Sequence, residues 1–121
     1  MSSKPFIVAL NRNQRNLEIL SKFLEQEGYS TLGVLNPAAL DETVRKKDNI
    51  SLVLMDISGF NSKVWESCEL LRQREIPFLV LSPHQQSAVE KHSKRHGAQG
   101  VLVKPLVVKE LLLLIKGLIE E

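Results

Sequence analysis

The most constraining feature of the sequence is a short apolar run that ends in a carboxylate. Within Ile50–Gly59, the residues from Leu52 to Met55 are all apolar and lead directly into Asp56. An uninterrupted run of this kind is typical of a strand buried on both faces of a parallel sheet. An acidic residue at the carboxyl end of such a strand lies at the edge where open α/β sheets bind their ligands. Asp56 is therefore the first candidate functional residue.

Strand and helix patterns alternate along the whole chain. Apolar runs predict further strands at residues 6–10, 30–35, 78–81 and 100–103. Helical spacing of apolar residues predicts helices at residues 14–27, 36–48, around 64–71, 84–96 and 107–120. This alternation predicts an α/β fold, a doubly wound five-stranded parallel sheet formed by one domain over residues 1–121. The pattern alone leaves the strand order open.

Composition excludes several classes of protein. Sixteen basic and fourteen acidic residues give the 121-residue chain a net charge of +2, which does not indicate nucleic-acid binding. The single cysteine, Cys68, rules out an intramolecular disulfide and favours a reducing, cytoplasmic location. No apolar run reaches the length needed to span a membrane. We therefore expect neither a nucleic acid nor a membrane as a partner.

Reactive or polar residues follow three of the predicted strands. Asp56 ends the third strand, Ser82 follows the fourth, and Lys104 follows the fifth. The carboxyl ends of parallel strands share one edge, so a carboxylate, a hydroxyl and an ammonium group meet there if these strands are neighbours. A carboxylate oxygen can act as a nucleophile toward a phosphoryl group, while a lysine and a hydroxyl bind the phosphoryl oxygens. The spacing is thus typical of a phosphoryl site.

The order and spacing of these motifs resemble the receiver domains of bacterial and archaeal two-component response regulators. The strands ending in Asp56 and Ser82, the turn at Gly97 and the Lys104-Pro105 pair carry the resemblance. It implies a flavodoxin-like strand order of 2-1-3-4-5. It also implies that Asp56 is the phosphoacceptor, Ser82 the switch hydroxyl and Lys104 the phosphate-binding lysine, with a proline after it that is usually cis.

Two positions depart from the family pattern. Asn11 and Arg12 stand where receivers carry two adjacent acids that hold Mg²⁺. Mg²⁺ prefers oxygen ligands in octahedral geometry, and Arg12 places a positive charge where the cation would bind. We therefore expect a degenerate metal pair with no metal site and no cofactor, unless an active acceptor still uses Mg²⁺. Arg12 either extends into solvent or folds over Asp56, and the sequence leaves both open.

These features predict a stand-alone, atypical receiver domain in phosphorelay signal transduction, acting by binding partners and not as an enzyme. A histidine kinase or another signalling protein would be the partner. The alternative is a phosphorylation-independent pseudo-receiver that works as an adaptor. A small-ligand-binding or enzymatic α/β domain is less favoured, because the sequence has no Gly-rich phosphate loop and no nucleophile–base pair. The cognate kinase, the output pathway and the oligomeric state are left open.

The last predicted helix carries more apolar residues than one sheet face would cover. At about 100° per residue, its sheet-facing side consists of Val108, Leu111, Leu112, Ile115 and Ile119. Val107, Leu114 and Leu118 extend this stripe to one flank, and an apolar flank left in water usually marks an interface. By resemblance, receivers often dimerise through this region. We therefore expect a homodimer or another protein on Val107, Leu114 and Leu118.

His92 and His96 lie four residues apart on the fourth predicted helix, as two metal ligands on one face would. No acidic third ligand is adjacent to them. A solvated helix face is therefore favoured over a zinc site.

Overall fold

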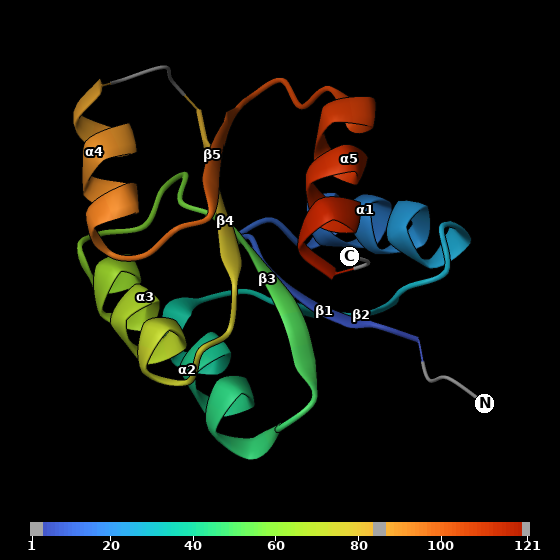
Figure 1. Ribbon diagram of the computed structural model, residues 1–121, viewed down its shortest axis with the longest axis horizontal. Coiled ribbons are helices and arrows are strands. Elements are labelled where there is room, and N and C mark those ends of the chain that lie inside the picture. The colour runs from blue at the N-terminus through green and yellow to red at the C-terminus, as the bar shows by residue number, and fades with distance from the viewer. Residues whose placement is uncertain (1–3, 84–86, 120–121) are drawn as a thin grey trace.

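The computed structural model describes residues 4–83 and 87–119, in which strands and helices alternate (Figure 1). The strands are β1 (Phe6–Leu10), β2 (Ser30–Val34), β3 (Ile50–Asp56), β4 (Phe78–Ser82) and β5 (Gly100–Val103). The helices are α1 (Gln14–Gln26), α2 (Pro37–Lys46), α3 (Lys63–Gln73), α4 (Ser87–Arg95) and α5 (Val108–Ile119). All neighbouring strands are parallel and their order is β2-β1-β3-β4-β5. The predicted doubly wound, flavodoxin-like sheet is confirmed.

Local signals place the helix ends close to their predicted positions. The side chain of Asn13 accepts a hydrogen bond from the Asn16 backbone N–H at 3.0 Å, and so caps α1. Asn36 caps α2 in the same way, by accepting from the Ala39 N–H at 2.8 Å. After α1 the chain turns at Gly28, whose φ is +98°. Residues 84–86 of the predicted fourth helix and residue 120 of the predicted last helix lie outside the described residues.

Successive strand residues contribute to two hydrophobic layers, one on each face of the sheet. Figure 1 shows α2 and α3 on one face of the sheet and α1 and α5 on the other. The layer under α2 and α3 contains the strand residues Val8, Leu10, Val53, Met55, Phe78 and Val80. The layer under α1 and α5 contains the strand residues Ile7, Ala9, Leu52, Leu54 and Leu79. The central strand β3 is thus buried on both faces, as its unbroken apolar run predicted. Its last apolar residues, Leu54 and Met55, lie in opposite layers, so Asp56 follows a strand that is packed on both faces.

Helix α5 faces the sheet much as its periodicity predicted, with one exception. Leu111 and Ile115 are buried, and Leu112 and Ile119 are partly buried against the same layer. Val108 was expected on the sheet-facing side, yet half of it is exposed (50%). The prediction is wrong because Val108 lines a cleft between α1 and α5 that is open to solvent.

Among the described helices, none combines the length and the apolar character that crossing a membrane would require.

The buried thiol of Cys68 gives a direct test of this packing. Cys68 lies on α3 against the Met55 sulfur at 3.7 Å, and burial raises the pKa of its thiol to about 12. Because the thiolate is the reactive form, we expect a disulfide reagent to leave the folded protein unlabelled at mildly alkaline pH. After unfolding in urea, the single cysteine should react completely. The reaction is measured by the absorbance of the released reagent. Fast, stoichiometric labelling of Cys68 in the folded protein would contradict this packing.

Candidate functional site

The carboxylate of Asp56 is the buried charge at the carboxyl edge of the sheet. Asp56 ends β3 and is only 4% exposed. Its Oδ2 forms an ion pair with the Lys104 ammonium and accepts a hydrogen bond from Asn11 Nδ2 at 3.0 Å. Its Oδ1 accepts from the backbone N–H of Ser58 at 3.0 Å. Both carboxylate oxygens are therefore bound, by groups from the segments that follow β1, β3 and β5.

Lys104 links the ends of three strands. Its Nζ pairs with Asp56 and also donates to Ser58 Oγ at 2.9 Å. Its backbone N–H donates to the carbonyl oxygen of Ser82 at 2.9 Å, which joins the ends of β4 and β5. The Lys104-Pro105 peptide bond is cis, as the family resemblance implied. The ammonium is partly exposed, so it covers Asp56 on the side that faces solvent.

Ser82 lies beside these two residues at the end of β4. It is buried, and the register pairs Asp56 with Leu81, so Ser82 is one residue farther along the neighbouring strand. The structure therefore brings Asp56 and Lys104 into direct contact and places Ser82 at the same edge. This is the arrangement that the three strand ends predicted from the sequence.

Of the two orientations that the sequence left open for Arg12, the structure is nearer to the solvent-exposed one, since Arg12 is exposed and contacts Gly59. Its Nη1 donates to the carbonyl oxygen of Gly59 at 3.4 Å, so the side chain lies across the loop that follows Asp56. Gly59 makes room for it, because a Cβ built at that position would lie 2.3 Å from Arg12 Nη1. Gly59 also has a φ of +79°, which side-chain-bearing residues rarely adopt. The only sequence signal for this contact was the glycine itself, three residues after Asp56.

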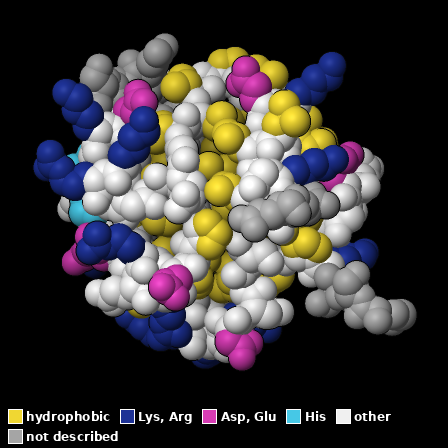
Figure 2. Space-filling model, in the orientation of Figure 1, with side chains coloured by type: hydrophobic (Ala, Val, Ile, Leu, Met, Phe, Trp, Pro, Cys, Tyr) yellow, Lys and Arg dark blue, Asp and Glu magenta, His cyan; other side chains and the backbone are white. Residues whose placement is uncertain are grey.

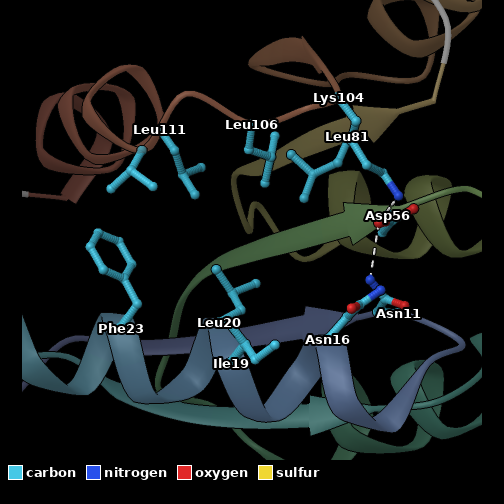
Figure 3. A pocket seen from close by; sticks show the side chains of 11 residues that line it. Asn11, Asn16, Ile19, Leu20, Phe23, Asp56, Leu81, Lys104, Leu106 and Leu111 are labelled. Carbon is cyan, nitrogen blue, oxygen red and sulfur yellow. Dashed lines mark hydrogen bonds and ion pairs between the residues drawn. The ribbon is translucent and has the colours of Figure 1, made fainter.

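A cleft of ≈ 330 Å³ opens beside Asp56, between α1 and α5 (Figure 3). In the close-up, Ile19, Leu20 and Phe23 of α1 face Leu106, which precedes α5, and Leu111 in the first turn of α5. Polar groups line the other end, namely Asn11, Asn16, Asp56 and Lys104. The cleft is therefore apolar along its walls and polar where it meets the carboxylate. Sequence periodicity could not predict it, because it depends on how far apart α1 and α5 lie.

The two histidines considered as metal ligands pack against an aromatic ring instead. The ring centroids of His92 and His96 lie 4.3 Å and 5.5 Å from that of Trp65 on α3. His96 Nδ1 also lies 3.3 Å from the Glu69 carboxylate. The expectation of a solvated face is wrong for these two positions, which join α4 to α3. Within residues 4–83 and 87–119, no cluster of three His, Cys, Asp or Glu side chains could hold a metal ion.

Comparison with known families agrees with this geometry. The family model of the response regulator receiver domain matches residues 7–116, which include the edge residues Asn11, Asp56, Ser82 and Lys104. The chain belongs to the response regulator receiver family. The receiver fold and its place in two-component signalling, which the family resemblance implied, are thereby confirmed.

Two sequence relatives of this receiver are longer proteins. The peroxide stress-activated histidine kinase mak1 of Schizosaccharomyces pombe is 26% identical over 113 residues, which are 86% of this chain and 7% of the kinase. The heme response regulator HssR of Staphylococcus saprophyticus is 24% identical over 105 residues, which are 86% of this chain and 46% of HssR. The chain thus spans less than half the length of either relative.

The fold of this receiver is also found in solved structures. One is the complex of the Saccharomyces cerevisiae histidine phosphotransfer signaling protein Ypd1 with the receiver domain of its downstream response regulator Ssk1. A chain of that complex superposes with a TM-score of 0.85 at 16% identity, covering 98% of this chain and 91% of that one. At this level of identity the comparison bears on the fold alone.

The contact between Arg12 and Gly59 can be measured through stability. Gly59→Ala should lower the free energy of unfolding by more than the roughly 1–2 kcal/mol expected for a left-handed backbone, because its Cβ also displaces Arg12. Gly28→Ala is the matched control, since Gly28 has a φ of +98° and no atom within 4 Å of a built Cβ. Urea unfolding of both variants, each with and without Arg12→Ala, separates the cost of the left-handed backbone from the cost of displacing Arg12. Equal losses for Gly59→Ala and Gly28→Ala would contradict the contact.

Proposed function

We propose that this receiver accepts a phosphoryl group on Asp56 and passes the signal on by binding partner proteins, without being an enzyme. The observation that most supports the proposal is the buried Asp56 carboxylate, which is in direct contact with Lys104 at the edge that also holds Ser82. A buried charge is costly unless it is paired, so a carboxylate kept at this edge suggests a function. A cytoplasmic location fits the single, buried, free cysteine.

In the proposed reaction, an Asp56 carboxylate oxygen attacks the phosphorus of a phosphohistidine on the donor protein. The new P–O bond forms as the P–N bond breaks, and the bonding electrons leave with the imidazole nitrogen. Lys104 and the Ser82 hydroxyl then bind oxygens of the transferred group. Phosphorylation replaces a compact carboxylate with a bulky group of about two negative charges, which rearranges the ends of β4 and β5.

A histidine kinase or a histidine phosphotransfer protein is the proposed donor. The receiver domain of Ssk1 is found in complex with the phosphotransfer protein Ypd1, which supports a donor of this kind. Residues that border the cleft between α1 and α5 would meet the donor, because the cleft opens directly beside Asp56 (Figure 3).

Receiver domains bind Mg²⁺ at the phosphorylation site, and we infer that this site is poorly suited to that ion. Mg²⁺ requires near-octahedral oxygen coordination. Asn11 donates its amide nitrogen to Asp56, while its Oδ1 accepts from the Asn13 N–H at 2.8 Å. The Asp56 carboxylate is itself already paired with Lys104. We therefore propose an atypical receiver whose metal pair, at Asn11 and Arg12, is degenerate.

Two alternatives each have an observation in their favour. A phosphorylation-independent adaptor is supported by the fixed partners of Asp56, which already neutralise its charge. Binding of a small amphipathic ligand is supported by the ≈ 330 Å³ cleft, whose size and apolar walls are typical of ligand sites. A thermal-shift screen of metabolites distinguishes a ligand-binding protein from an adaptor, because an adaptor should show no stabilisation by a particular metabolite.

We propose a partner surface on α5, at Val107, Leu114 and Leu118, for a second copy of the chain or another protein. Figure 2 shows hydrophobic side chains over α5 and β5, while charged side chains gather toward the edges of the same view. Val107 is 54% and Leu114 37% exposed, whereas Leu118 packs partly against the core and contributes less. Leu113, next to Leu114, is also exposed and widens the surface.

Phosphorylation of Asp56 is tested by intact mass. Incubation with acetyl phosphate and Mg²⁺ should add the mass of one phosphoryl group to the wild type and none to Asp56→Asn. Lys104→Met should slow the addition, because the phosphoryl oxygens lose a cationic partner. An unmodified wild type would favour the adaptor hypothesis. Addition that persists in Asp56→Asn would place the acceptor elsewhere.

The homodimer is tested by sedimentation across micromolar concentrations. Leu114→Glu should shift the protein toward the monomer, because a buried carboxylate opposes an apolar contact. Leu32→Glu is the matched control, since Leu32 lies on the edge strand β2 and is 38% exposed, close to the value for Leu114. If the wild type is monomeric throughout, the α5 surface either binds another protein or is only a weakly covered part of the core.

A further inference from the structure

The proposed phosphoryl transfer gives Arg12 no part, although its side chain lies close to this edge of the sheet. Its guanidinium lies over the loop that begins directly after Asp56, where it donates to the Gly59 carbonyl at 3.4 Å. A Cβ at position 59 would lie 2.7 Å from the Arg12 Cζ, so the arginine side chain would have to shift from its present position. A cationic side chain thus lies on this loop, three residues after the candidate phosphoacceptor.

The charges at the edge favour an oxyanion over a metal ion. Asp56 contributes one negative charge, and Lys104 and Arg12 contribute one positive charge each. A divalent cation would add two positive charges to a group that is already positive. A phosphorylated Asp56 instead loses its carboxylate charge and gains a group of about two negative charges. The two side-chain cations would then balance the phosphoryl group without a metal ion.

We propose that Arg12 is a phosphoryl-binding residue and that it replaces the metal ion, so that Asp56 is phosphorylated without Mg²⁺. This inference rests on the proposed function of Asp56 as acceptor. During transfer, the guanidinium leaves the Gly59 carbonyl, a weak and exposed partner, and binds two oxygens of the phosphoryl group side by side. Lys104, which already contacts Asp56, binds a further oxygen.

The chemical step is balanced with phosphoramidate as the donor. An Asp56 carboxylate oxygen forms a bond to phosphorus while the P–N bond breaks. The nitrogen takes the bonding electrons and leaves as ammonia, because it already carries the proton that it needs at neutral pH. No oxidant, reductant or metal enters the balance, and the protein supplies only positive charge and position.

The experiment measures the rate of phosphoramidate labelling by intact mass, with Mg²⁺ and with excess EDTA. The wild-type rate should be nearly the same in both, and Asp56→Asn should stay unlabelled. Arg12→Gln should slow labelling about 10- to 100-fold, the loss expected for hydrogen bonds to a charged group. Arg12→Lys should recover part of the rate, since it keeps the charge but not the paired donors. Arg45→Gln, an exposed arginine in the last turn of α2, is the control that should label like the wild type.

A binding measurement gives a second result that does not depend on labelling. Titration calorimetry with Mg²⁺ should give no saturable heat for the wild type. The double variant Asn11→Asp/Arg12→Asp restores two carboxylates, and it should bind Mg²⁺ and require it for labelling. Urea unfolding of Arg12→Gln verifies that a slower rate does not result from loss of folding.

The outcomes separate this inference from the proposed function. If the wild type is labelled only when Mg²⁺ is present, and Arg12→Gln is labelled at the same rate, the proposed role of Arg12 is overturned. Asp56 then remains the acceptor. If the double variant is labelled and the wild type is not, Arg12 blocks the acceptor. This result also overturns the proposed role of Arg12. No labelling of either protein under any condition would overturn both the inference and the proposed function.

Discussion

The buried carboxylate of Asp56 is the constraint on which the carboxyl edge of this sheet depends. Removing one partner of a buried charge typically costs about 3–5 kcal/mol, so its contacts hold their segments firmly. Lys104 comes from the end of β5 and Asn11 from the end of β1, and both reach Asp56 because β3 lies between these strands in the sheet. The strand order therefore brings together the residues that pair with this carboxylate.

Much of the fold and part of the site could be predicted from the sequence, because both follow from local patterns. The unbroken apolar run before Asp56 predicted a strand buried on both faces, and β3 is one. The positions of Asp56 and Lys104 at strand ends predicted their contact, since parallel strands share their carboxyl edge. The family match confirms the receiver fold. The strand order itself came from the resemblance and not from periodicity, which does not say which strands are neighbours.

The parts that could not be predicted depend on contacts between distant segments. Periodicity assigned Val108 to the inner side of α5, but it does not report whether another side chain fills the space that this side faces. His92 and His96 likewise looked solvated on their own helix, and only the position of Trp65 on α3 explains their packing. The path of Arg12 over Gly59 has the same origin, because it joins residues 47 positions apart.

A cation that belongs to the chain differs from a metal ion in one physical respect. A metal ion can dissociate, whereas the guanidinium of Arg12 stays at the edge at an effective concentration that no change in the surrounding solution lowers. In the resting state it is held on the Gly59 carbonyl, in the loop between β3 and α3. Binding of Arg12 to a phosphoryl group would therefore release this loop at the moment when Lys104 also leaves the carboxylate for the new oxygens. The loop after β3 and the end of β5 would then change together, because Arg12 contacts that loop at Gly59 and Lys104 contacts both Asp56 and Ser58.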